Sequence, residues 1–315
     1  MTELAPLPRK RGRAAANTKV AAANHPSPLG RNALERAMSL LFLLCGIVAV
    51  VFVLFISIYL LLSGLPAIRE IGVTNFLLGK TWSPGTGQYG ILPFLLTSVC
   101  GTAGAVVLGV PLGLMTAIFL AKAAPPRLAA VIHTAVELLA GIPSVVYGLV
   151  GMIVLVPAIQ RGFHLASGAT LLAAILVLSV MILPSVVQVA ETALRAVPAE
   201  YEQASLALGA TKLETAFRVS FPAARSGVAT AVVLGVGRAI GEAMAIIMVS
   251  GNVPNLPGLF QPVRFLTTAI ASEMSYASYG SLWRQSLFSV GLVLFLFILL
   301  INVLLNVLIK GRKER

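Results

Sequence analysis

The stretch PAEYEQASLALGATKLETAFRVSFP, residues 198–222, is a polar segment between two long apolar runs. Pro198 suits the first turn of a helix, and Gly209 is typical of a residue that follows a helix C-terminus. Thr211 and Glu214 have the spacing of a capping box, which predicts a second short helix that ends at Pro222. The stretch therefore predicts two short amphipathic helices at a bend, suited either to a soluble protein partner or to the membrane surface.

Each of these two helices has small and apolar residues at helical spacing, which predicts one packing face per helix. The first face holds Tyr201, Ala204, Ser205 and Leu208, and the second holds Leu213, Ala216, Phe217 and Ser220.

The rest of the chain is strongly apolar. Its 315 residues are 58% hydrophobic and only 11% charged, whereas a soluble domain carries roughly 25% charged residues. The apolar runs are continuous and do not alternate, which favours membrane-spanning helices over a β-barrel. The sequence therefore predicts an all-α membrane protein with six spans of the length that a bilayer requires. The expected spans are 38–62, 93–121, 128–157, 169–190, 224–250 and 285–309.

The positive charges predict the orientation of these spans. If the N-terminus is cytoplasmic, 17 of the 23 Lys and Arg residues fall in inner segments and five in outer loops, which is the asymmetry of the positive-inside rule. We therefore expect both termini in the cytoplasm, and we interpret the net charge of +12 as orienting the chain rather than binding nucleic acid. The expected organisation is a disordered basic tail (1–37), a first span (38–62), an outer loop (63–92), a transport domain (93–309) with an inner loop (195–222), and a short inner tail (310–315).

Several chemistries are disfavoured by what the sequence lacks. All eleven acidic residues are Glu, so there is no Asp for an aspartyl-phosphate pump or for nucleotide-bound magnesium. The segment GVTNFLLGKT (72–81) has the wrong glycine spacing for a phosphate-binding loop. The three histidines are scattered, and both cysteines lie in apolar runs. We expect a transport subunit that is not an enzyme and that holds no cofactor or metal itself.

The stretch GVGRAIGEAMAIIMVSGN, residues 235–252, places Arg238 and Glu242 inside an apolar run. Residues four apart on a helix share a face, so the sequence predicts that the two side chains pair. A guanidinium presents a planar fork of donors that suits a tetrahedral oxyanion. Ionisable residues inside a membrane are functional by default, and this favours a role in a translocation path over an ion pair that only locks helix packing.

Three further residues are weaker candidates for the same path: Glu137 within the third expected span, Ser144 directly after the helix-bending Pro143, and Asn252 at the outer end of the fifth. Glu273 in the last outer loop is expected to be a solvated carboxylate.

The segment QASLALG followed nine residues later by VSFP resembles the EAA motif of ABC importer permeases. Gly209, Val219, Phe221 and Pro222 fall on the spacing of that motif, Gln203 takes the place of its Glu, and Ser205 that of its second Ala. In that family the loop inserts into a cleft of a cytoplasmic ATPase and transmits its closure. The resemblance implies that coupling to the ATPase falls on residues Glu202, Gln203, Ala204, Ser205, Gly209 and Pro222.

The match extends to the phosphate-specific permeases, and in particular to the PstC type. The segments that carry it are GRAIGEAMA (237–245), ELLAGIPSVVYGL (137–149), FLLGKTWSP (76–84), YGILPF (89–94) and LTTAIASEM (266–274). The resemblance covers roughly residues 38–310. It implies the six-span fold of a type I ABC importer permease in the bacterial inner membrane, and it agrees with a path role for Arg238 and Glu242.

The resemblance also implies partners: a PstA-type permease, a cytoplasmic ATPase dimer that binds ATP and Mg, an extracytoplasmic phosphate-binding protein, and membrane lipid. Three alternatives remain open. The first is an ABC permease for sulfate or molybdate. The second is an ion-coupled secondary transporter or channel, for which inverted repeats are expected. The third is a purely structural membrane subunit.

Overall fold

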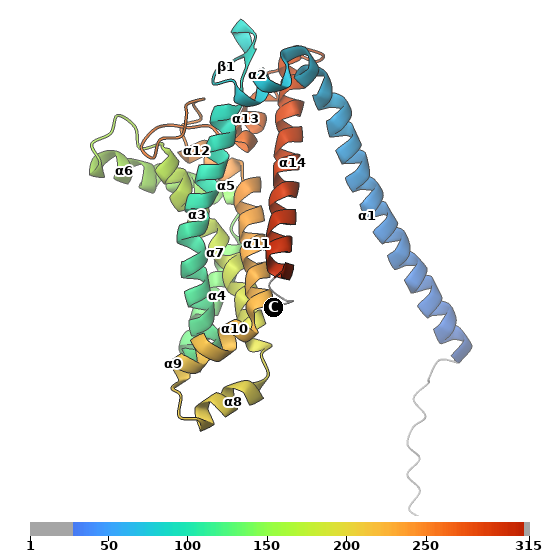
Figure 1. The fold of residues 1–315 in the computed structure, drawn as a ribbon, viewed down its shortest axis with the longest axis vertical. Coiled ribbons are helices and arrows are strands. Elements are labelled where there is room, and N and C mark those ends of the chain that lie inside the picture. The colour runs from blue at the N-terminus through green and yellow to red at the C-terminus, as the bar shows by residue number, and fades with distance from the viewer. Residues whose placement is uncertain (1–27, 312–315) are drawn as a thin grey trace, which may run out of the picture. The chain divides into compact units, whose positions relative to one another are not determined.

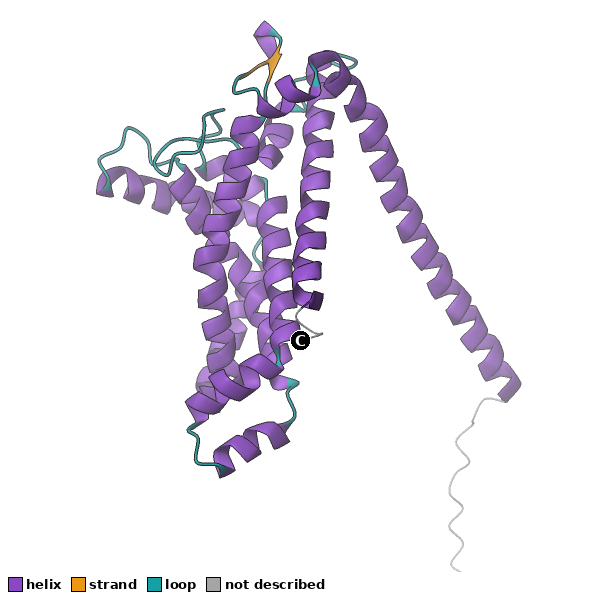
Figure 2. Ribbon diagram, viewed as in Figure 1, coloured by secondary structure: helices purple, strands orange, loops and turns teal. Residues whose placement is uncertain are grey.

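The computed structural model describes residues 28–311, and 1–27 and 312–315 lie outside the described part. Most of the expected basic tail therefore falls outside it, but 28–37 form helix rather than the disordered chain predicted there. The described chain is helical apart from one short hairpin (Figures 1 and 2). It divides into two units, residues 1–56 and 57–315. The described part of the first unit is one helix, the beginning of α1 (Pro28–Ile71), whose apolar side chains are exposed as a lipid-facing span requires.

The second unit contains the helices of the bundle and its connections. Four long helices are the end of α1, α3 (Leu92–Ile118), α7 (Leu171–Arg195) and α14 (Leu282–Gly311). The shorter helices are α2 (Val73–Leu78), α4 (Pro126–Gly141), α5 (Ser144–Val150), α6 (Val156–Gly162), α8 (Ala199–Ala207), α9 (Lys212–Thr215), α10 (Phe221–Ala223), α11 (Arg225–Gly241), α12 (Met244–Val249) and α13 (Leu266–Glu273). Within 28–311, five helical segments are long and apolar enough to cross a membrane, and a sixth if the bent pair 212–223 and 225–241 counts as one span.

The centre of the bundle is the contact between α3 and α7, against which α11 also packs. Gly109 and Gly113 of α3 make this contact close: a Cβ added to Gly109 would come within 2.7 Å of Ile182, and one added to Gly113 within 2.8 Å of Val186. Ile182 and Val186 of α7 are fully buried. Small residues at this spacing let two helices approach without a gap, so α3 and α7 form a rigid base for the elements around them.

Two of the six expected spans are not continuous helices. The span expected at 128–157 is interrupted at Ile142 and Pro143, where the backbone is extended between α4 and α5. Proline lacks an N–H and disfavours helical geometry in the residue before it, which explains this interruption. The span expected at 224–250 is interrupted at Glu242, which is extended (φ −74°, ψ 133°) between α11 and α12. The single helices predicted for these two spans are therefore wrong.

The segment 198–222 forms the two short helices predicted for it. The first is α8, and Gly209 after it has a left-handed backbone (φ +89°) that glycine tolerates at low cost. The capping box of Thr211 and Glu214 is present at the start of α9. The helix does not end at Pro222, because a π-helical turn, η4 (Ala216–Ser220), leads into α10, and the chain bends by 76° after Ala223. We call this part of the bundle, residues 196–224, the loop end.

The opposite part of the bundle, residues 72–91 and 250–281, carries the hairpin and is called the hairpin end. Strands β1 (Trp82–Ser83) and β2 (Gln88–Tyr89) pair antiparallel with Trp82 opposite Tyr89, around the 3₁₀ turn η1 (Pro84–Thr86). The loop predicted over 63–92 thus contains the end of α1, helix α2 and this hairpin. Figure 1 shows α2, β1 and α13 together at this end.

Candidate functional site

Arg238 lies one turn before the C-terminus of α11 and is half-buried. Its Nη1 donates to the hydroxyl of Ser185 in α7 at 3.4 Å, a long and weak contact. Among the residues that the structure describes, Arg238 makes no ion pair. The predicted pairing with Glu242 is therefore not formed, and the guanidinium keeps most of its donors for another acceptor.

Glu242 is part of the interruption between α11 and α12. Its Oε1 accepts the backbone N–H of Ala245 at 3.0 Å and so caps the start of α12. Its backbone oxygen, freed by the end of α11, accepts the hydroxyl of Thr267 from α13 at 2.7 Å. The expected (i, i+4) pair requires a continuous helix, and the helix stops at Gly241, one residue before Glu242.

Helix α5, which follows the interruption after α4, packs against α12, which follows the interruption after α11. The oxygen of Leu139 accepts the phenol of Tyr147 at 2.7 Å, which satisfies one carbonyl at the end of α4. Gly148 of α5 faces Ala245 of α12: a Cβ added to Gly148 would lie 2.8 Å from the Ala245 Cα and 2.9 Å from its oxygen. Ser144 is the first residue of α5. Discontinuous helices that meet inside a membrane protein are typical of transporter binding sites.

Replacing Gly148 with alanine tests whether this contact is required. The added methyl group meets backbone atoms of Ala245, so we expect a destabilisation of about 1–3 kcal/mol from overpacking. The measurement is thermal unfolding of the purified complex in detergent. Gly141→Ala is the matched control, because a Cβ there meets nothing within 4 Å. Equal melting temperatures for the two variants would contradict this packing.

Glu137 belongs to a separate charged cluster on α4 and α7. His133 Nδ1 lies 3.2 Å from Glu137 Oε1, and His133 Nε2 lies 4.0 Å from Glu191 Oε2. Arg195 pairs with Glu191 at 2.8 Å and donates to the oxygen of Leu120 at 3.1 Å. The Glu137 side chain is 59% exposed, so its predicted role in lining a path stays a prediction. Both acidic residues have partners four residues away, a spacing that was visible in the sequence.

Asn252 anchors the hairpin end. It has a left-handed backbone (φ +51°), and its oxygen accepts two donors from Arg264, at 3.0 and 2.8 Å. Its side-chain Oδ1 is buried and has no protein hydrogen-bond partner in the described structure, as is also true of the hydroxyls of Thr97 and Ser250. The structure thus gives Asn252 a structural role in addition to the path role predicted for it.

Glu273 is not the solvated loop carboxylate expected from the sequence. Its side chain is only 14% exposed and forms an ion pair with Arg264. Its Oε2 accepts both indole N–H groups of Trp82 and Trp283, at 2.9 and 2.8 Å. The partners come from the hairpin, from the segment before α13 and from α14, and for this reason the local sequence around Glu273 gave no sign of its burial.

Glu202 joins α8 to the bundle at the loop end. Its carboxylate pairs with Lys122 and accepts the hydroxyl of Ser220 at 2.9 Å. Lys122 lies in the π-helical turn η2 (Phe119–Ala123) at the end of α3, and Ser220 lies in η4. Next to it, the hydroxyls of Ser205 and Thr215 are 2.9 Å apart. The side chains of Glu202 and Ser205 therefore bond to other residues of this chain.

The other side of the loop end is open. Gln203 and Ala204 are exposed, and Tyr201 and Leu208 are 57% and 90% exposed. The packing face predicted for the first helix, with these two residues at its ends, is thus not buried within this chain. The backbone N–H and hydroxyl of Thr211 hold the pKa of Glu214 below its usual value, because both donate hydrogen bonds to the charged carboxylate.

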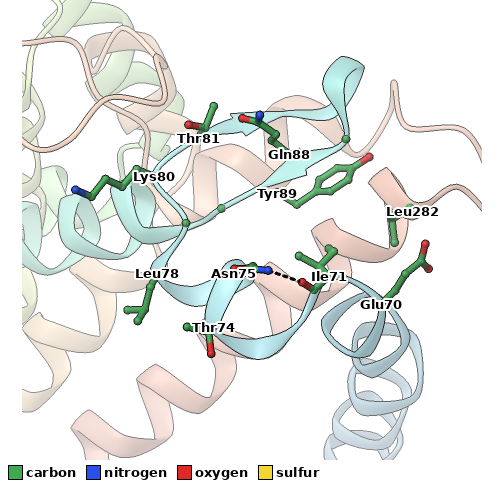
Figure 3. Close-up of a pocket in the computed structure, with 13 residues that line it drawn as sticks. Glu70, Ile71, Thr74, Asn75, Leu78, Lys80, Thr81, Gln88, Tyr89 and Leu282 are labelled. Atoms are coloured by element: carbon green, nitrogen blue, oxygen red, sulfur yellow. Dashed lines mark hydrogen bonds between the residues drawn. The ribbon is translucent and has the colours of Figure 1, made fainter.

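Two recesses are lined by residues other than Arg238 and Glu242. One of about 650 Å³ between α3, α5 and α7 is lined almost entirely by apolar residues and does not suit a hydrated anion. The other, about 560 Å³ at the hairpin end, has polar walls, with Glu70 and Lys80 at opposite sides (Figure 3). Burial and the charge of Glu70 raise the pKa of Tyr89 in that recess. Neither recess includes a residue that the sequence singled out for the path.

A bundle of apolar spans with two interrupted helices, an unpaired guanidinium beside them and an exposed helical loop at one end defines a multi-pass membrane transport subunit. Residues 109–313 match the family described as binding-protein-dependent transport system inner membrane component, and the chain belongs to this family. It is a permease subunit of ABC importers and not an enzyme.

Three similar proteins illustrate the range of the match. The chain is 41% identical over 269 residues to a probable ABC transporter permease protein, YqgH, of Bacillus subtilis, which covers 82% of this chain and 87% of that one. It is 36% identical over 281 residues to the phosphate transport system permease protein PstC of Haemophilus influenzae, covering 82% and 88%. A structure of the MetNI methionine ABC transporter in an inward-facing conformation covers 70% of this chain and 95% of its own at a TM-score of 0.56 and 19% identity, which shows the type I importer fold.

Proposed function

We propose that this chain is the PstC-type permease subunit of a phosphate importer. The observation that carries the proposal is Arg238, a half-buried guanidinium without a carboxylate partner among the described residues, beside two interrupted spans. Burying an unpaired cation is costly unless a ligand neutralises it, and a guanidinium fork suits a tetrahedral oxyanion. Several relatives are phosphate transport permeases by name, which supports phosphate as that oxyanion.

Glu242 supplies the second element of recognition. Its Oε1 is used to cap α12, while its Oε2 makes no hydrogen bond to the described residues. A carboxylate oxygen accepts a hydrogen bond from the P–OH group of monohydrogen phosphate, whereas sulfate at neutral pH has no O–H to donate and is repelled. Arg238 binds the anion, and Glu242 favours the protonated one.

The proposed complex contains the remaining parts of the importer. A PstA-type permease completes the path, and a cytoplasmic ATPase dimer carries ATP and Mg and grips the loop end through Gln203, Ala204 and the exposed residues around Gly209 and Pro222. Both termini lie in the cytoplasm, so the hairpin end faces outward and receives the phosphate-binding protein. Ser144, the first residue of α5, and Asn252, three residues after the end of α12, line the path.

Reconstitution of the complete complex in proteoliposomes tests this function. We expect ATP hydrolysis and uptake to rise when phosphate-loaded binding protein is present outside, and to stay at the basal level when the outer medium contains sulfate or molybdate instead. Stimulation by sulfate and not by phosphate would assign the permease to the other oxyanion class. Uptake by this chain without any ATPase would contradict the whole assignment and favour an ion-coupled carrier.

A further inference from the structure

Helix α13 connects the interrupted helix at the candidate path with the surface of the hairpin end. Near its start, the hydroxyl of Thr267 donates to the backbone oxygen of Glu242 at 2.7 Å. At its other end, Glu273 holds the ion pair with Arg264 and the two indole N–H groups. The helix has eight residues, so it spans about 12 Å at ~1.5 Å per residue.

The contacts of Glu273 with Arg264, Trp82 and Trp283 link the end of α13 to the hairpin, so these residues move together. Arg264 is fixed a second time by the oxygen of Asn252, and its guanidinium lies 5.8 Å from the centre of the Phe94 ring. The indole of Trp82 packs against Tyr89 across the hairpin. A displacement of the hairpin therefore moves Glu273 and, with it, α13.

This cluster borders an open recess of about 440 Å³. Its walls are Pro84 and Gly85 of the hairpin turn, Tyr276 and Trp283, with Glu273 beside them. Tyr276 is 76% exposed although it carries a large aromatic ring. Exposed tyrosines beside a recess are typical anchor residues of protein interfaces, because the ring buries area and the hydroxyl finds a partner.

We propose that α13 is a transmission helix: the extracytoplasmic binding protein docks at the recess beside Tyr276, and α13 passes its arrival to the interrupted helix at Glu242. This inference rests on the proposed function, in which a binding protein delivers the substrate to the hairpin end. Docking shifts the hairpin and the Glu273 cluster. The hydroxyl of Thr267 then pulls on the backbone oxygen of Glu242. The side chain of Glu242 bonds to the start of α12, and Arg238 lies four residues earlier, in the last turn of α11.

The side-chain contacts of α13 distinguish the residues that transmit a movement to Glu242 from those that only pack the helix in the bundle. Leu266, Thr268 and Ala269 are buried and hold the helix in the bundle. Within residues 28–311, the hydroxyl of Ser272 bonds only to its own helix, at 2.7 Å from the oxygen of Thr268 and 3.4 Å from that of Ala269. Thr267 is the residue of α13 whose hydroxyl bonds to the interruption at Glu242, so Ser272 offers a matched control in the same helix.

The test compares Thr267→Val, Thr267→Ser and Ser272→Ala in the reconstituted complex with phosphate-loaded binding protein. The isosteric valine keeps the packing and removes the hydroxyl. We expect the stimulation of ATP hydrolysis by the binding protein to fall about five-fold in Thr267→Val, with unchanged basal hydrolysis and unchanged affinity for the binding protein. Thr267→Ser restores the hydroxyl and Ser272→Ala leaves it untouched, so both should behave as the wild type.

The docking half of the proposal is tested by Tyr276→Ala, which should raise the Kd of the binding protein about ten-fold without a change in basal hydrolysis. Full stimulation in Thr267→Val, an equal loss in Ser272→Ala, a loss of basal hydrolysis in Thr267→Val, or unaltered affinity in Tyr276→Ala would each overturn the inference. A wild-type complex that responds only to a binding protein loaded with another oxyanion would contradict the phosphate assignment instead. The same variants are then compared with that protein, and their result decides the role of α13.

Discussion

Replacing Arg238 with alanine is expected to reduce phosphate uptake by roughly 10²–10⁴-fold, because two charge-assisted hydrogen bonds to the anion are lost at about 1.5–3 kcal/mol each. Arg238 has only the 3.4 Å contact to Ser185 to lose within the chain, so folding and assembly should survive. Uptake of labelled phosphate into proteoliposomes gives the rate, and gel filtration of the complex reports assembly.

Two further variants serve as controls for the Arg238→Ala experiment. Arg238→Lys keeps the charge but not the fork, and we expect it to recover only part of the uptake. Arg161→Ala, at the end of α6, removes an arginine away from the interruptions and should transport normally. Normal uptake by an assembled Arg238→Ala complex would show that the path does not depend on this guanidinium.

Replacing Glu202 with alanine is expected to uncouple ATP hydrolysis from transport. The change leaves Lys122, only 12% exposed, without its carboxylate and removes the acceptor of Ser220. Breaking a buried pair is costly because the remaining charge is desolvated, although partial exposure of Glu202 reduces the effect. We expect phosphate transported per ATP hydrolysed to fall about ten-fold, which corresponds to ~1.4 kcal/mol of coupling, measured as the ratio of the two rates in proteoliposomes.

The controls for Glu202 use its neighbour and its partner. Glu200 is exposed on the same helix, and Glu200→Ala should leave coupling intact. Exchanging the charges in the double variant Lys122→Glu with Glu202→Lys should restore much of the coupling that each single variant loses. If the exchange fails while both proteins assemble, the two residues do not act as a pair.

The features that depend on neighbouring residues could be predicted from the sequence. The capping box at Thr211 and the end of the first short helix before Gly209 were confirmed because the interactions that produce them lie within four residues. The interruption at Pro143 was anticipated only as a bend. The interruption at Glu242 was not predicted, because an apolar run does not reveal that a side chain will cap a new helix three residues later.

Contacts between distant segments could not be predicted in this way. The partners of Glu202 are 80 and 18 residues away, and Trp82 is 191 residues from Glu273. The apolar surroundings of Arg238 and Glu242 therefore identified both residues as unusual. Their (i, i+4) spacing predicted a pair, and this was wrong because the spacing applies only if the helix continues between them. The general lesson is that the sequence located the charged residues but their partners follow from the packing of the bundle.

The π-helical turns η2 and η4, which carry Lys122 and Ser220, limit changes in the length of the loop 198–222. Each residue advances an α-helix by roughly 100°, so the wider turn of η4 sets the rotational phase of α9 relative to α10. Adding or deleting one residue between Gly209 and Pro222 would rotate Ser220 away from the carboxylate that it now reaches. The nine-residue spacing between Gly209 and Val219 thus keeps Ser220 aligned with its acceptor. Side-chain substitutions leave this alignment unchanged, whereas insertions remove it.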